Sequence, residues 1–186
     1  MLKRFRLFAV AIAVLAILTA TAWLTTSKSF AQANRDAANG NGTVLVQDEQ
    51  NTTFRRHFSF NARRNPDGTV TGGGILQNPA FTGVDGKTYT ASFDISCLRI
   101  EGNVAVMGGT IKRTNEPNLV DTVFFAVQDV GEPGKNRDYI SLLVFNDEDP
   151  TTNTGDPQSC QDLLIEDFGM LLIDAGNIQV RGSSSQ

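Results

Sequence analysis

The stretch TYTASFDISC, residues 88 to 97, alternates almost perfectly between polar and apolar side chains. Successive residues of a β-strand point to opposite faces of a sheet, so this pattern predicts a strand with one packed face and one solvated face. The side chains expected on the packed face are Tyr89, Ala91, Phe93, Ile95 and Cys97. The stretch therefore predicts a β-fold whose strands each bury one side.

The same strand leads into a hairpin. It meets Gly102-Asn103, a two-residue turn signal, before a second apolar run over residues 104–113. With a loop of two residues, Leu98 faces Met107. Apolar side chains occupy odd positions up to Cys97 and even positions after it. This change of phase predicts a bulge or a change of packed sheet at that point.

Short runs of the same type recur along the chain and are separated by turn-forming residues. They span residues 43–47, 57–62, 69–77, 122–128, 139–145 and 177–181. No long pattern with a period of 3.6 residues interrupts them. The sequence predicts an all-β fold, an antiparallel β-sandwich or a partly closed barrel. One short helix is predicted over residues 161–168, with two apolar strands, 163–165 and 170–173, as the alternative.

The N-terminal segment has the features of a secretory signal peptide. Three basic residues precede an apolar run from Leu7 to Leu24, and Ala31-Gln32-Ala33 fits a small-x-small cleavage site. An uncleaved membrane anchor is the alternative, because the apolar run is near the lower limit of roughly 17 residues for a spanning helix. We predict cleavage after residue 33 and delivery to the periplasm or the extracellular space.

The remainder is expected to be one domain. Cleavage leaves 153 of 186 residues, a usual domain size. Residues 34–42 are predicted as a flexible lead-in, 43–181 as the β domain and 182–186 as a flexible tail. The leader carries four cations and no acid, so the remainder holds 12 basic and 20 acidic side chains, a net charge of −8. That balance disfavours nucleic acid and anionic membrane surfaces as partners, and no second membrane span is predicted.

Two cysteines, Cys97 and Cys160, remain after cleavage. An even number in an oxidising compartment predicts a disulfide, and two cysteines allow only one pairing. The alternatives are a thiol nucleophile or a pair of metal ligands. Both lack support, because His57 is the only histidine and no C-x-x-C spacing exists. The sequence therefore favours a bridge that closes a long loop.

The loop DVGEPGKNRD, residues 129 to 138, has two interpretations. Pro133 and Gly134 occupy the positions that suit a type II turn. Alternatively, five acidic side chains of this loop and of a second acidic loop could supply oxygens to Ca²⁺ as a cofactor. They are Asp129, Glu132, Asp138, Asp147 and Asp149. Lys135 and Arg137 would compete with a cation for the same carboxylates. We favour the turn and keep calcium as the alternative.

Signatures of catalysis are sparse. Alternation places His57 opposite Phe58 and Phe60, on the exposed face, and no G-x-S-x-G motif accompanies it. The glycine run in TVTGGGILQ lacks the lysine of a phosphate-binding loop and predicts a bulge or close sheet packing. The sequence does not decide whether two carboxylates form the catalytic pair of a glycoside hydrolase, because the distance between them depends on the fold. Taken together, these observations favour a protein that is not an enzyme.

Three motifs, in order, carry a resemblance. They are CLRIEGNVAVMGGTI, VQDVGEPGKNRDYISLLVF and GNIQVR. From Phe58 onward the chain resembles a group of secreted bacterial all-β modules of uncharacterised function, which share a cysteine-containing strand, a G-N-x-A hairpin, a D-x-G-E-P-G turn and a closing G-x-I-x-V strand. The chain departs from that pattern at Val130, where such modules often have a polar residue. The resemblance implies an exported β module and no catalytic residues.

Three functions follow as hypotheses. The first is a non-enzymatic exported module of the cell envelope or extracellular space that binds an envelope partner or a glycan, with Ca²⁺ stabilising its loops. The second is a closed barrel that holds a small apolar ligand among five aromatic side chains: Phe58, Phe60, Phe93, Phe124 and Phe125. The third is a carbohydrate-active enzyme that uses two acids.

Overall fold

The computed structural model describes residues 35–117, 122–146 and 156–183. The predicted leader lies outside these ranges, as do Asp147 and Asp149 of the second acidic loop.

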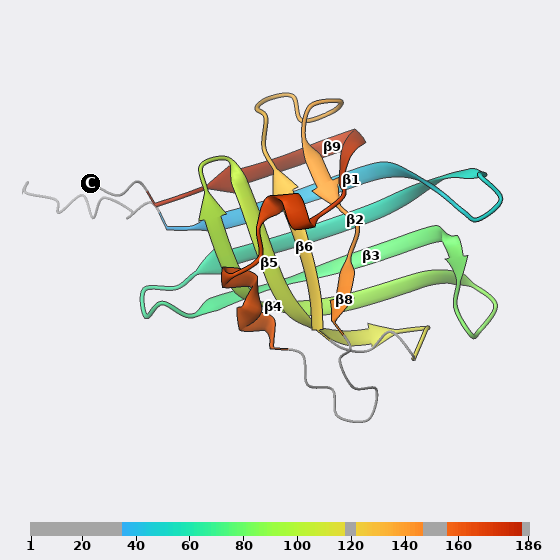
Figure 1. The fold of residues 1–186 in the computed structure, drawn as a ribbon, viewed down its shortest axis with the longest axis horizontal. Coiled ribbons are helices and arrows are strands. Elements are labelled where there is room, and N and C mark those ends of the chain that lie inside the picture. Colours follow the sequence, from blue (N-terminus) through green and yellow to red (C-terminus); the bar gives the residue numbers. More distant parts are fainter. Residues whose placement is uncertain (1–34, 118–121, 147–155, 184–186) are drawn as a thin grey trace, which may run out of the picture. The chain divides into compact units, whose positions relative to one another are not determined.

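The described residues form one antiparallel sheet (Figure 1). Its nine strands are β1 (Ala37–Gln47), β2 (Thr53–Arg64), β3 (Val70–Thr82), β4 (Thr88–Glu101), β5 (Val104–Thr114), β6 (Thr122–Gln128), β7 (Tyr139–Ser141), β8 (Val144–Asn146) and β9 (Met170–Arg181). Each strand from β1 to β6 pairs with the next one in the chain, and β9 pairs with both β7 and β1. The result is a closed eight-stranded up-and-down barrel. The predicted all-β antiparallel class is confirmed, in its barrel form.

β8 does not add a separate strand to the ring. β6 pairs with β7 through Val127 and Gln128, and with β8 through residues 122–124. β7 and β8 therefore lie along the same edge of β6, as one strand interrupted at Leu142-Leu143.

The first strand corrects the prediction of a flexible lead-in over residues 34–42. β1 already begins at Ala37 and pairs with β2 on one side and β9 on the other. Its small residues look loop-like in sequence but suit close packing between two strands. A Cβ at Gly42 would lie 2.1 Å from the carbonyl oxygen of Ala175. Glycine is therefore required by the approach of the backbones, and the segment is a strand.

The hairpin between β4 and β5 has the predicted register. Leu98 pairs with Met107, and the register shifts between Ile95 and Cys97, where a bulge was expected. The bulge changes one detail of the prediction. Ile95 and Leu98 both belong to the barrel interior, whereas Cys97 belongs to a cluster on the outside. The alternation that placed Cys97 on the packed face ends one residue before it.

The barrel interior is filled by apolar side chains. Three rings meet at its centre, with Phe125 packed edge to face against Phe60 and Phe93 at centroid distances of 5.4 and 5.6 Å. Phe58 lies beside Phe60 in the same core. Phe124, predicted with these four, lies in the outer cluster instead. A void of only about 10 Å³ remains among the rings.

The glycine run on β3 is explained by this core. Residues 72–74 pair in unbroken register with both β2 and β4, so close packing applies and a bulge does not. The ring of Phe93 covers Gly74, and a Cβ there would lie 2.4 Å from the ring atoms.

We expect Gly74→Ala to lower the free energy of unfolding by about 1–3 kcal/mol, because the ring of Phe93 must move against Phe125. Denaturant unfolding followed by circular dichroism measures the loss. Gly73→Ala is the matched control, since its nearest atom outside the adjacent residues is a carbonyl oxygen at 3.2 Å. It should change stability by less than about 0.5 kcal/mol. Equal losses in the two variants would show that the ring contact is not the cause.

The segment 156–168 covers the outside of the barrel over β4, β5 and β6 (Figure 1). Two short 3₁₀ turns, η1 (Pro157–Gln161) and η2 (Ile165–Asp167), replace the predicted helix over residues 161–168. The side chain of Asp156 caps η1 by accepting the Gln158 amide at 2.8 Å. The segment buries Cys160 and Phe168 against Val106, Phe124 and Ala126. β5 and β6 are therefore buried on both faces over much of their length, which explains their continuous apolar runs.

Candidate functional site

The loop DVGEPGKNRD joins β6 to β7 beside β9, and its aspartates accept hydrogen bonds from backbone amides. The carboxylate of Asp138 is fully buried and accepts the amides of Val130 and Ile178, each at 2.9 Å. Asp129 accepts the amides of Gly131 at 2.9 Å and Val180 at 3.0 Å. The two aspartates therefore hold the loop to itself and to β9.

The rest of the loop is fastened to the same strand. Asn177 donates to Glu132 Oε1 at 2.8 Å, and its own Oδ1 accepts the Gly134 amide at 2.8 Å. The positive φ that a type II turn requires at Gly134 is found at Gly131 (98°) and Asn136 (58°) instead. Glycine is needed at 134 for space, because a Cβ there would lie 2.0 Å from Asp138 Oδ2. The segment is a turn, although of another type than predicted.

The predicted calcium ligands are brought together only in part. Asp129, Glu132 and Asp138 share this loop, while Asp147 and Asp149 lie outside the described residues. Within the described ranges, no group of three or more His, Cys, Asp or Glu side chains is placed to hold a metal ion. Each of the three loop acids already accepts hydrogen bonds. Calcium binding stays a prediction for the protein.

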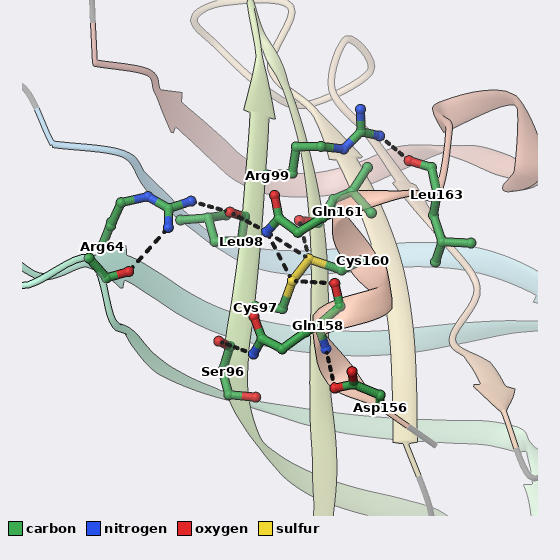
Figure 2. The surroundings of a disulfide bond; sticks show 12 residues. Arg64, Ser96, Cys97, Leu98, Arg99, Asp156, Gln158, Cys160, Gln161 and Leu163 are labelled. Atoms are coloured by element: carbon green, nitrogen blue, oxygen red, sulfur yellow. Dashed lines mark hydrogen bonds between the residues drawn. A yellow bond between two sulfur atoms is a disulfide. The ribbon is translucent and has the colours of Figure 1, made fainter. Parts of the chain in front are cut away.

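The predicted disulfide is formed between Cys97 and Cys160, and both cysteines are fully buried (Figure 2). Hydrogen bonds on either side hold the covering segment to β4. Gln158 donates to the carbonyl of Ser96 at 3.1 Å, and Gln161 donates to the carbonyl of Leu98 at 3.3 Å. The guanidinium of Arg99 donates to the carbonyl of Leu163. The disulfide and these hydrogen bonds therefore stabilise this side of the barrel.

The opposite end of the barrel, where β1 joins β2 and β3 joins β4, is hollow. A cavity of about 340 Å³ opens there, within the size range of small-molecule sites. Its described lining residues are Arg56, Leu76, Asn78, Phe81, Thr82, Tyr89, Glu116, Leu142 and Leu143. We call it the mouth cavity. A shallower hollow of about 490 Å³ adjoins it, sharing Asn78, Phe81 and Leu142 and extending over Leu45, Val46 and Leu171.

Two irregular strands flank the mouth cavity. The register between β3 and β4 shifts between Asn78 and Thr82, so residues 79–81 leave the ladder. On another side, the interruption between β7 and β8 places Leu142 and Leu143 at the cavity. Bulges of this kind commonly re-aim side chains beside binding sites. Below the cavity the aromatic core is solid, so a ligand would stay at the mouth.

Arg56 is the unusual member of the lining. It is 2% exposed, and its Nη2 donates to the carbonyl of Ser141 at 2.8 Å. Its Nε has no hydrogen-bond partner among the described residues. None of the ion pairs between described residues includes it. Burial lowers the pKa of Arg56 to about 10, which leaves the guanidinium charged at neutral pH.

Tyr89 supplies a second buried polar group to the same cavity. It is 4% exposed, and its hydroxyl makes no hydrogen bond of good geometry to any described residue. Burial raises the pKa of Tyr89; the nearby hydroxyl of Thr114 acts in the opposite direction, and the charge of Glu116 adds to the rise. The tyrosine is therefore a neutral hydrogen-bonding group at neutral pH.

Sequence reasoning did not single out Arg56, although a signal was present. Arg56 precedes Phe58 and Phe60 by two and four residues in RRHFSF, so strand alternation places its side chain on the same inward face as these two rings. His57 is exposed as predicted. Of the five predicted aromatic lining residues, four fill the core below the cavity and Phe124 lies outside the barrel.

Fold and site together define a closed up-and-down β-barrel with an apolar mouth cavity that contains a buried cation. Compared with protein families, with curated proteins and with solved structures, the chain has no significant match in any of the three. Among the residues that the structure describes, no helix is long and apolar enough to cross a membrane.

Proposed function

We propose that the protein is an exported, non-enzymatic binding barrel that takes a small, mainly apolar ligand in the mouth cavity. The observation that carries this proposal is the cavity itself. It is large enough for a small molecule, and the surface that its described lining residues present is mainly apolar. The predicted leader and the disulfide fit a protein that works outside the cytoplasm.

The exposed apolar side chains at the rim support the same function. Phe81 is 61% exposed and Leu142 is 46% exposed, and both line the mouth cavity and the adjoining hollow. Apolar groups left in water at the edge of a cavity gain most from a ligand that covers them. A glycan would present hydroxyl groups to this lining and leave them without partners.

The hypothesis of a two-acid carbohydrate enzyme finds less support at this cavity. Glu116 is the one carboxylate among its described lining residues. Hydrolysis of a glycosidic bond by that chemistry needs two carboxylates that flank the scissile bond.

The test is a fluorescence titration of the purified, oxidised protein with Nile red, an uncharged apolar dye, followed by competition with decan-1-ol. We expect saturable binding to the wild-type protein. Leu142→Asp should weaken it by about tenfold or more, because an ionised carboxylate would face the dye in place of an apolar side chain.

Val84→Asp is the matched control. Val84 is also apolar and is more exposed than Leu142, at 68%, but it is not among the residues that line the cavity. It should bind the dye as the wild type does. Absence of saturable binding to the wild type, or equal effects of the two substitutions, would overturn the proposal.

A further inference from the structure

We propose that the ligand of the mouth cavity is an anionic amphiphile, a carboxylic acid with an apolar tail, and that Arg56 binds its carboxylate. This inference rests on the proposed function and adds the chemical class of the ligand. It follows from one property of the cavity that apolar binding alone does not explain. A charged side chain lies at the inner part of an otherwise mostly apolar site.

The first step is the cost of that charge. Arg56 is surrounded by apolar side chains, among them Phe58, Leu76 and Leu143, which line a small void with it. A buried, unpaired cation destabilises a fold strongly, and apolar residues of similar size are often as stable or more so at such positions. Residues that break the packing rules of a core tend to mark functional sites. The charge of Arg56 therefore calls for an anion that the described residues do not provide.

Among the described residues that line the cavity, Glu116 is the one acid, and it forms no ion pair with Arg56. It lines the cavity and is half-buried, nearer to solvent than Arg56. Its charge acts on Tyr89, whereas burial is the cause of the pKa shift of Arg56. The charge of Glu116 therefore does not offset the burial of Arg56.

The second step is the direction of the guanidinium. Its Nη2 is fixed by the carbonyl of Ser141, the last residue of β7 before the interruption. Ser141 is itself held, because its hydroxyl accepts the amide of Ala126 at 2.9 Å. The guanidinium, whose Nε is buried and unpaired within the described ranges, is therefore held in one position before any ligand arrives. A guanidinium binds a carboxylate through parallel N–H groups, and this bidentate geometry favours a carboxylate over a neutral hydroxyl.

The third step concerns the rest of the ligand. The hydroxyl of Tyr89, without a good partner, and the buried amide of Asn78 line the same cavity and are neutral polar groups for the second oxygen. From there the apolar walls lead past Phe81 and Leu142 into the adjoining hollow. A ligand with its polar head at Arg56 and its apolar tail across the rim matches this arrangement of polar and apolar side chains.

The experiment compares decanoic acid with decan-1-ol as competitors of Nile red at pH 8, where the acid is ionised. The two ligands differ only at the head group. We expect the acid to bind the wild-type protein at least tenfold more tightly, the range of a hydrogen bond to a charged group. Arg56→Met should abolish this preference and leave the affinity for the alcohol within about threefold.

Arg55→Met is the matched control, because Arg55 is the preceding residue, is exposed, and pairs with Asp174 on the outside. It should keep the preference for the acid. If both ligands bind the wild type equally, the head-group inference fails while the proposed function stands. If neither binds, both fail. If Arg55→Met loses the preference for the acid as Arg56→Met does, Arg56 is not the group that recognises the carboxylate.

Stability gives a readout that a merely structural arginine would not produce. Arg56→Met should unfold at the same denaturant concentration as the wild type or a higher one, and saturating decanoate should raise the midpoint of the wild type alone. A variant that is less stable yet still prefers the acid would assign Arg56 to the fold and overturn the inference.

Discussion

Replacing both cysteines by alanine is expected to lower the free energy of unfolding by about 4 kcal/mol. The Cys97–Cys160 bridge closes a loop across 63 residues, and opening so long a loop restores much of the conformational freedom of the unfolded chain. The measurement is urea unfolding of Cys97→Ala/Cys160→Ala beside the oxidised wild type. A loss of this size is a large fraction of the roughly 5–15 kcal/mol that separates the folded and unfolded states of a typical domain.

Loss of the disulfide should leave ligand binding by the folded barrel largely unchanged. The bridge ties the segment 156–168 to the outer face of β4, β5 and β6, whereas the mouth cavity lies at the open end. We therefore expect the folded variant to keep its affinity for an apolar ligand within about threefold. The wild type reduced by dithiothreitol is the control and should lose a similar amount of stability. A loss below about 1 kcal/mol in both would show that loop closure contributes little here.

The strands that the sequence predicts best are those with one buried face. Alternation over residues 88–97 and the Gly102-Asn103 turn lead directly to the pairing of Leu98 with Met107. The bulge was also foreseen, because apolar residues change parity there. β5 and β6 are harder, since both faces are covered and neighbouring residues are buried alike. Phe124 and Phe125 illustrate this: nothing in their sequence tells which one enters the barrel.

The candidate site was less predictable, for two physical reasons. Parity places Arg56 inward with Phe58, but a charged side chain is normally expected to reach solvent, so sequence alone argues against its burial. The mouth cavity also depends on the departure of residues 79–81 from β3 and on the interruption between β7 and β8. Pro79 marks the first irregularity, because proline cannot donate to a strand ladder, whereas the interruption at Leu142-Leu143 has no such local signal. Such a site becomes visible only when the barrel is closed.

Asp138→Asn is expected to lower the free energy of unfolding by about 3 kcal/mol. Both carboxylate oxygens of Asp138 accept buried backbone amides, from Val130 and Ile178. An asparagine keeps one acceptor and turns an NH₂ group toward the other amide, which loses a charge-assisted bond and leaves a buried N–H without a partner. Glu132→Gln is the matched control from the same loop. Its side chain is exposed and keeps an acceptor, so the loss should stay below about 0.5 kcal/mol.

The same two variants decide between the turn and the calcium site. Urea unfolding is measured in EDTA and in millimolar CaCl₂. If calcium at about 100 times its dissociation constant bound only the native state, it would stabilise the wild type by roughly 2.7 kcal/mol. Because the oxygens of Asp138 are already engaged by backbone amides, we expect coincident curves in the two solutions and the same loss for Asp138→Asn in both. A gain with calcium that Asp138→Asn removes would instead make DVGEPGKNRD a cation site.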